Sequence, residues 1–349
     1  MKLLRSLLVA VAGSAVLVVI ASTLVHAPAP EAPATSNSLP EIPQPAAPPQ
    51  EAKGPKSVER IGVMSHQPLR EVSGIVKSET YDGVWWVHND SGDKARFFAV
   101  DAEGDVIFPE RLGSRYHGAR RVAGQRPWPG HLVHGAVNFD WEDIALSEGR
   151  LYLADMGNNR NNRRDLGVYV VNEPNPREIQ DTRKLTFYPI RYPDQHAFPP
   201  EEEIWEFDSE ALFVDDGTLY MLTKHRPAGE LDGMSRGTKL YRLDTMHTDK
   251  ENVLTLIERH NSLPVPTGAC LSPDGSKLAV LCYSAVYVFE RPAEGDRWLS
   301  DGRGHRLRLP VHRTLQAEAI TWDDDKTLRI ANEQRSIFRI EVGALSPVD

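Results

Sequence analysis

One unit of sequence recurs along this chain, and it constrains the fold more than any other feature. Each copy opens with a short segment led by Ser, Glu or Thr, continues into an apolar segment, and closes with a third segment of alternating apolar residues. The five copies begin at Ser73, Glu142, Glu210, Thr267 and Glu318. A recurring unit of several strands is typical of a radial β-architecture, in which neighbouring units cover each other's faces.

The strands of each unit can be assigned along the sequence. The second strands are predicted at 85–87, 151–153, 219–221, 278–280 and 328–330. The third strands are predicted at 97–100, 168–171, 239–243, 286–289 and 337–340. Outer fourth strands are predicted at 105–112, 184–188, 253–257 and 306–310. Asp216-Gly217, Asp274-Gly275 and Glu103-Gly104 stand between such runs, where tight hairpins favour residues that accept positive φ. The fold class is therefore all-β, a β-propeller of four-stranded blades.

The two ends of the repeat region predict how the ring closes. The last unit has no fourth strand before Asp349, and a spare strand, 58–63, precedes the first unit. That strand would complete the last blade and remove exposed sheet edges. Five copies predict five blades. Six blades remain the alternative if 113–138 forms another, although the Gly- and Pro-containing stretch 113–135 is interpreted as a long loop.

The N-terminal region predicts export. Lys2 and Arg5 precede an apolar stretch at 7–25, as in a signal peptide or an N-terminal membrane anchor covering 1–27. Pro28 directly after Ala27 disfavours cleavage, and the stretch is long enough to span a bilayer, which favours an uncleaved inner-membrane anchor. The positive-inside rule then places the rest in the periplasm or another extracytoplasmic space. Residues 28–55 are a Pro/Ala-rich disordered linker, and 56–349 form the propeller.

The net charge indicates which kinds of partner the chain can bind, and the cysteine spacing indicates whether a disulfide can form. The chain has 40 Lys and Arg against 49 Asp and Glu, a net charge of -9, which argues against nucleic acid as a partner and is compatible with cation binding. Cys270 and Cys282 would be offset by several residues on one hairpin, with Cys270 opposite Ala279 and Cys282 opposite Thr267. This offset argues against a disulfide between them.

The first residue of each unit should face the axis of the propeller. The resulting ring is Ser73, Glu142, Glu210, Thr267 and Glu318. Carboxylates that face one another in a narrow channel repel unless they bind protons or a cation, and oxygen ligands in an irregular arrangement favour Ca²⁺. The ring therefore predicts a calcium site. The competing interpretation is that these side chains hydrogen-bond to neighbouring blades.

A second set of polar residues follows the second strands at the same mouth of the channel. Asp90, Asp155 and Glu333 are the candidate general acids or bases. The candidate substrate-binding residues are Asn89, Asn158, Asn159, Arg160, Lys224 and Arg226, among which the cations suit an anionic group. The alternative for the asparagines is a turn-forming role through Asx-type hydrogen bonds.

Two resemblances follow from these residues. The Ser/Glu/Glu/Thr/Glu ring resembles the channel of the five-bladed calcium-dependent apyrases, which implies a central Ca²⁺ but no substrate class. The segments Val72-Ser73-Gly74, Asp140-Trp141-Glu142-Asp143 and Gln316-Ala317-Glu318-Ala319, together with 88–92 and 154–159, resemble a family of bacterial exported β-propellers loosely related to phytase-like and lactonase-like propellers. That second resemblance spans most of residues 70–340 and implies a fold and a location rather than a reaction.

Two functions remain open at this point. One is a metal-dependent hydrolase of a small anionic phosphorylated or ester substrate, with Ca²⁺ on the axis. The other is a non-catalytic periplasmic propeller that binds a cell-envelope component and holds a purely structural ion. A monomer is expected in either case.

Overall fold

The structure is a computed structural model that describes residues 57–348. The predicted anchor or signal peptide at 1–27 and the predicted linker at 28–55 lie outside these residues. Within the described part of the chain, no helix combines the length and the apolar character that crossing a membrane requires. The longest α-helix there, α1, is the single turn Val311–Thr314.

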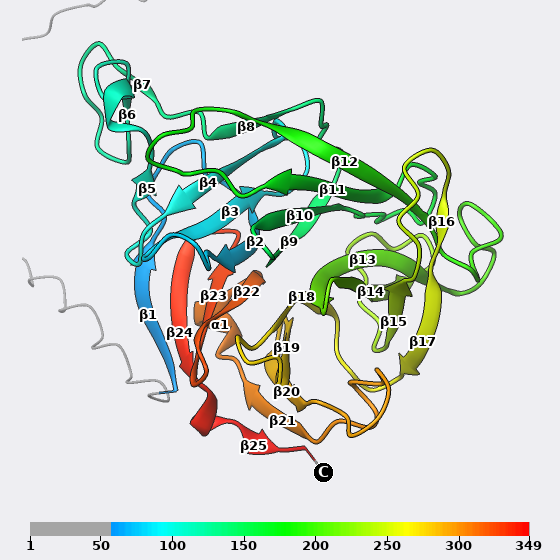
Figure 1. The fold of residues 1–349 in the computed structure, drawn as a ribbon. Coiled ribbons are helices and arrows are strands. Elements are labelled where there is room, and N and C mark those ends of the chain that lie inside the picture. The colour runs from blue at the N-terminus through cyan, green and yellow to red at the C-terminus, as the bar shows by residue number, and fades with distance from the viewer. Residues whose placement is uncertain (1–56, 349) are drawn as a thin grey trace, which may run out of the picture. The chain divides into compact units, whose positions relative to one another are not determined.

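Five strands lie side by side around the centre of the molecule (Figure 1). They are β2 (Val72–Lys77), β9 (Trp141–Ser147), β13 (Ile204–Asp215), β18 (Pro266–Leu271) and β22 (Ala317–Asp324). Each contacts the next in this order, and β22 contacts β2, so the inner strands close into a ring. The five repeated positions lie on the strands of this ring.

From each inner strand the chain runs outward as an antiparallel meander. The second strands are β3 (Trp85–Asn89), β10 (Arg150–Asp155), β14 (Thr218–Pro227), β19 (Lys277–Cys282) and β23 (Thr327–Asn332). The third strands are β4 (Arg96–Val100), β11 (Gly167–Asn172), β15 (Thr238–Leu243), β20 (Ala285–Glu290) and β24 (Ser336–Glu341). The outer strands are β5 (Val106–Ile107), β12 (Thr182–Arg191), β17 (Thr255–His260), β21 (Gly304–Arg308) and β1 (Val58–Val63). The predicted all-β propeller is confirmed, and so is its closure, because β1 pairs with β24.

The region 113–135 differs from the predicted long loop. It contains the short strands β6 (Tyr116–His117), β7 (Arg126–Pro127) and β8 (His131–His134). Strand β8 pairs with β4 on one side and with β12 on the other. This bridging strand joins the first two meanders into one sheet, so sheet boundaries alone do not give the number of blades.

The first outer strand is also shorter than predicted. Instead of a strand over 105–112, the structure has the two-residue β5 followed by a 3₁₀ turn at Glu110–Leu112. Pro109 precedes this turn. Because proline has no N–H to donate to a sheet, a ladder hydrogen bond is not available there, and the strand ends.

Two short β elements accompany the meanders. Strand β16 (Asn252–Val253) pairs in parallel with β12, and β25 (Ser346–Pro347) pairs with β21. Asp216-Gly217 forms the predicted hairpin turn between β13 and β14, with φ of 47° and 74° at the two residues. Positive φ at both positions matches the right-handed twist of the flanking strands.

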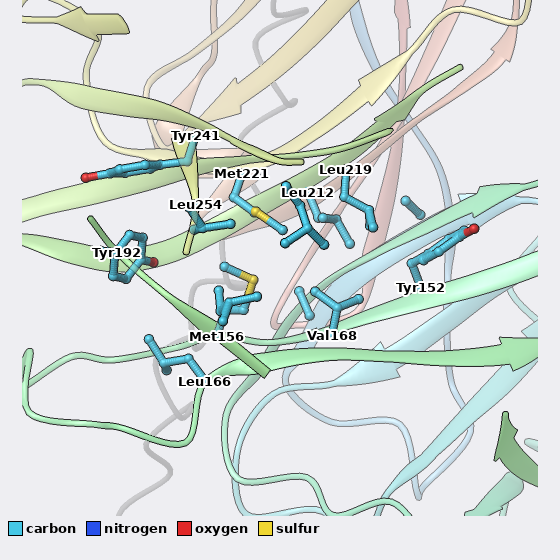
Figure 2. Close-up of a cluster of buried hydrophobic side chains, with 14 of the residues drawn as sticks. Tyr152, Met156, Leu166, Val168, Tyr192, Leu212, Leu219, Met221, Tyr241 and Leu254 are labelled. Carbon is cyan, nitrogen blue, oxygen red and sulfur yellow. The ribbon is translucent and has the colours of Figure 1, made fainter. Parts of the chain in front are cut away.

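Apolar side chains pack between adjacent meanders. Figure 2 shows one such layer, in which Val168 and Met156 face Leu212, Leu219 and Met221. These side chains are almost completely buried. Burial of one such side chain stabilises the fold by about 1.5–3 kcal/mol, so these layers hold the meanders together and fix the inner ring.

The two cysteines are free, as their predicted offset requires. Cys270 pairs with Ala279 as expected, and Cys282 pairs with Pro266, one residue from the predicted Thr267. They therefore lie at different levels of one hairpin.

Candidate functional site

The repeated position is a β-bulge in every inner strand. Ser73, Glu210, Thr267 and Glu318 are each skipped in the pairing with the second strand, whereas residues on both sides are paired. In β9 the bulge contains Glu142 and Asp143, which together stand opposite Ala154. A bulge bends its strand and re-aims a side chain. The five ring residues are therefore structurally equivalent, as their sequence context predicts.

The residue after each ring position shows how crowded the axis is. These residues are Gly74, Asp143, Ala211, Gly268 and Ala319. A Cβ added to Gly268 would lie 2.7 Å from the backbone oxygen of Glu318. Small residues are thus needed at this level, and only Asp143 carries a long side chain there.

Asp143 fills this level and connects three inner strands. Its Oδ1 accepts a hydrogen bond from the Ile144 N–H at 2.8 Å. Its Oδ2 accepts from the N–H groups of Leu212 at 2.8 Å and Ala269 at 3.2 Å. The side chain is fully buried. Asp143 is therefore a structural carboxylate that ties β9 to β13 and β18.

Carboxylates gather at the mouth of the channel. Oxygens of Glu142, Asp208 and Glu210 lie within 4.8 Å of one another, and so do oxygens of Asp90, Asp140 and Glu142. Glu142 belongs to both groups. Since Ca²⁺ binds oxygen ligands at about 2.3–2.6 Å, ligand oxygens up to about 5 Å apart can share one ion. The oxygen-only donor set and its spacing fit a hard divalent cation.

Two cations lie among these carboxylates. The Lys224 ammonium forms an ion pair with Glu210 and lies 3.8 Å from Asp208 Oδ2. The Arg226 guanidinium donates to Asp208 at 2.7 Å and to Asn159 at 2.5 Å, and its Nε–H has no partner among residues 57–348. Lys224 and Arg226 therefore place positive charge beside the acidic groups.

A cavity of about 300 Å³ opens at this mouth. Its wall contains the ring glutamates, both cations and two of the candidate acid–base residues. The lining is Asp90, Glu142, Asn159, Glu210, Lys224, Arg226, Leu231, Asp232, Gly233, Met234, Tyr283, Gln316, Glu318 and Glu333. Its size and polar wall suit a small polar ligand.

Burial and mutual repulsion raise the pKa values of these carboxyls. Burial, followed by the charges of Asp90, Asp208 and Glu210, raises the pKa of Asp140 to about 7. Burial also raises the pKa of Glu210 to about 7, although Lys224 opposes the shift. The pKa of Glu142 is raised well above its usual range by burial and by the charge of Glu210. Burial and the neighbouring carboxylates thus both disfavour the ionised forms at this site, and Lys224 offsets this only in part.

A pH dependence of stability follows. Without added cation, we expect the free energy of unfolding to fall as the pH rises from about 4.5 to above 7. Over this range the folded protein keeps protons on Asp140 and Glu210 that the unfolded chain has lost, and the slope is up to about 1.4 kcal/mol per pH unit for each such proton. Urea titrations at several pH values in the presence of EDTA measure the free energy of unfolding. Saturating Ca²⁺ should flatten the profile, and a profile that calcium leaves unchanged would contradict a shared cation.

The two hydroxyl members of the ring are engaged with neighbouring strands. Ser73 Oγ donates to the backbone oxygen of Glu142 at 2.6 Å, and Thr267 Oγ1 donates to that of Ala317 at 2.9 Å. Neither residue lines the cavity. Glu318 does line it and accepts a hydrogen bond from the Tyr283 hydroxyl at 2.8 Å. The hydroxyls thus match the alternative interpretation of inter-blade bonds.

The structure brings some of the predicted mouth residues to the cavity and leaves others outside its wall. Asp90, Asn159, Lys224, Arg226 and Glu333 line it.

Three other predicted residues are buried in hydrogen bonds that fix loops. Asn89 bonds to Pro68, Arg70 and Asp93, and Asn158 bonds to Phe207, Asp208 and Arg163. Asp155 accepts from Arg163 at 3.0 Å and from the N–H of Asp140 at 3.1 Å. Arg160 is exposed and is not part of the wall.

Two acidic residues of the cluster were not predicted. Asp140 and Asp208 each stand two positions before a ring glutamate, in the pattern Asp-x-Glu at 140–142 and 208–210. Asp208 lies in β13, and Asp140 directly precedes β9, so each is carried to the mouth by the strand of its glutamate. The doubled pattern was a usable signal for a second pair of carboxylates beside the ring.

Fold and site together define the class of this protein. It is an all-β propeller with a cavity at one mouth of its central channel, and the cavity is lined by carboxylates together with Lys224 and Arg226.

No family model and no curated protein sequence matches the chain. Solved structures with a similar fold include two described as glucose dehydrogenase, at 10% and 9% identity and TM-scores of 0.41 and 0.42, each covering 82% of this chain and 99% of its own. A third is a gluconolactonase from Xanthomonas campestris, at 14% identity and a TM-score of 0.35, covering 83% of this chain and 92% of its own. These likenesses are too distant to indicate activity or ligand.

Proposed function

We propose that this protein is a calcium-dependent hydrolase of a small anionic phosphorylated or ester substrate. The observation that carries the proposal is the position of Glu142, which belongs to two carboxylate groups, each compact enough to share a cation. In this proposal Glu142, Asp208 and Glu210 hold the ion, with Asp140 and Glu318 beside it. A bound Ca²⁺ would polarise the substrate oxygen and lower the pKa of a coordinated water.

The side chains of the cavity wall supply the remaining chemistry. Lys224 and Arg226 would bind the oxyanion of the substrate, and their charges would stabilise the negative charge that develops on attack. Asp90 lies at the wall near Asp140 and Glu142, where it can take the proton of the attacking water. Burial raises the pKa of Glu333, so that this carboxyl can hold a proton for the leaving oxygen. Asp155 is assigned a positioning role, because its carboxylate holds Arg163 and the backbone of Asp140.

The alternative is a non-catalytic propeller that binds a cell-envelope component and holds a structural ion. The ion pair of Lys224 with Glu210 favours it, since an internal cation already neutralises part of the ring. In both proposals the propeller lies outside the cytoplasm. Residues 1–27 direct its export, and residues 28–55 link them to the propeller.

A Lys224→Met substitution tests the hydrolase. Hydrolysis of p-nitrophenyl phosphate, p-nitrophenyl acetate and a γ-lactone is measured with Ca²⁺ and with EDTA. We expect calcium-dependent turnover of at least one substrate, and a loss of about 100-fold in kcat/KM in the variant, the size seen when one preorganised donor is removed. Calcium binding itself should persist or strengthen, because a competing cation is gone.

The matched control is Lys94→Met, which removes an exposed lysine in the loop that follows Asp90. It should retain full turnover. Absence of turnover in the wild-type protein, together with calcium stabilisation, would favour the binding alternative. Equal turnover in both variants would exclude Lys224 from the substrate site.

A further inference from the structure

A second surface of the molecule has the opposite charge character. Two cavities of about 360 Å³ and 350 Å³ lie beside the outer strand β21, and both are lined by Arg236, Tyr287 and Arg306. The two cavities are therefore adjacent, and together they are called the β21 groove; neither shares a lining residue with the acidic cavity. One of the two cavities is lined both by His260 of β17 and by Arg306 of β21, so the groove has walls from two neighbouring meanders.

Strand register explains why this groove is apolar at its floor and basic at its rim. In the antiparallel pair β20–β21, Ala285 lies opposite Arg308 and Tyr287 lies opposite Arg306. Residues that are directly paired present their side chains to the same face. On β20 this face is buried against the neighbouring meander, whereas on β21 the same face extends beyond the core and carries the two arginines.

In the part of the chain that the structure describes, the arginines of the rim have no acidic partners. Among residues 57–348, Arg236, Arg306 and Arg308 form no ion pair with a carboxylate, although the chain as a whole carries a net charge of -9. Arg236 makes only one weak hydrogen bond there, from Nη1 to the backbone oxygen of Ser262 at 3.2 Å. By contrast, Arg303, just before β21, lies 3.8 Å from Glu290. Guanidiniums that line one groove without an acidic partner among the described residues 57–348 are suited to bidentate binding of a carboxylate or phosphate.

The floor identifies the rest of the ligand. Leu263, Tyr287, Phe289 and Leu299 line the cavity on one side of the arginine pair, and Pro264, Ala285 and Leu309 line the other. These side chains are mostly buried, so only a small part of each faces the groove. An inorganic anion would leave that apolar part uncovered. We propose that the groove is a binding site for an amphiphilic anion, with its carboxylate or phosphate between Arg236 and Arg306 and its apolar portion on the Tyr287 floor.

Calorimetric titration of the full chain tests this inference. The probes are decanoate below its micelle concentration, decyltrimethylammonium with the same alkyl chain and opposite charge, and inorganic phosphate. We expect saturable one-to-one binding of decanoate, at least about tenfold weaker binding of phosphate, and no binding of the cation, because the head needs the arginines and the chain needs the floor. Equal affinity for phosphate would overturn the amphiphilic character, and binding of the cation would overturn the role of charge.

Substitutions assign the binding to the groove. Arg306→Gln and Arg236→Gln should each weaken decanoate binding by about tenfold or more, as expected for loss of a charge-assisted hydrogen bond. Arg303→Gln removes the same charge from a neighbouring position outside the groove and should leave affinity unchanged. All three side chains are exposed, so the unfolding midpoint should not move. Equal effects of all three substitutions, or of none, would overturn the assignment.

Discussion

Glu142→Gln is expected to abolish the stabilisation of this protein by calcium. In the wild-type chain, Ca²⁺ at about one hundred times its Kd should add about 2.7 kcal/mol to the free energy of unfolding and raise the midpoint by a few degrees. Glu142 is the carboxylate shared by both candidate groups, so its loss removes a ligand from each. We expect no measurable shift in the variant, and a loss of calcium affinity of at least about 100-fold.

Without calcium, Glu142→Gln should be at least as stable as the wild-type protein. Burial and the charge of Glu210 raise the pKa of Glu142, which means that its ionised form is unfavourable in the empty site. A neutral glutamine of the same shape removes that repulsion. At pH 8 with EDTA, the midpoint of Glu142→Gln should therefore equal or exceed that of the wild type.

The control is Glu148→Gln, an exposed residue in the turn that follows the same strand β9. Scanning calorimetry of the three proteins, with Ca²⁺ and with EDTA, gives both readouts. The idea of an axial cation fails if calcium stabilises Glu142→Gln as much as it stabilises Glu148→Gln, or if calcium does not stabilise the wild type.

Asp143→Ala should be the most destabilising single substitution on the channel axis. The buried N–H groups of Leu212 and Ala269 would lose their acceptor, and an unsatisfied buried donor costs about 1–3 kcal/mol. Two such donors together remove about 2–6 kcal/mol from a typical total of about 5–15 kcal/mol. Chemical denaturation of the variant measures the loss.

Asp143→Asn separates the hydrogen bonds from simple packing. The amide keeps the volume of the side chain but turns one acceptor into a donor, which then faces a backbone N–H. We expect a loss smaller than that of Asp143→Ala and clearly larger than that of Asp325→Ala, an exposed turn residue. A small effect of Asp143→Ala, similar to that of Asp325→Ala, would show that the three strands do not depend on this carboxylate.

The sequence alone determined the propeller class, its strand order and its closure by the N-terminal strand. These features depend on alternation of apolar residues and on turn chemistry, which are local and recur along the chain. The same local signals gave wrong predictions in two places. At 105–112 the strand ends early, before Pro109. At 113–135 strand β8 forms by pairing with β4 and β12, and β12 is distant in sequence.

The ring of the site could likewise be predicted, because each unit repeats one position. The bulge that holds each ring residue depends on the pairing of two strands, and no single segment specifies that pairing.

Only the tertiary structure decided which polar groups share the site. It placed Asp140 and Asp208 beside the ring glutamates and put Lys224 between two carboxylates. It also directed the Ser73 and Thr267 hydroxyls to neighbouring backbone oxygens. Contacts of this kind join residues up to 69 positions apart, and their energies come from burial and from summed charge, which depend on the whole ring rather than on any one segment.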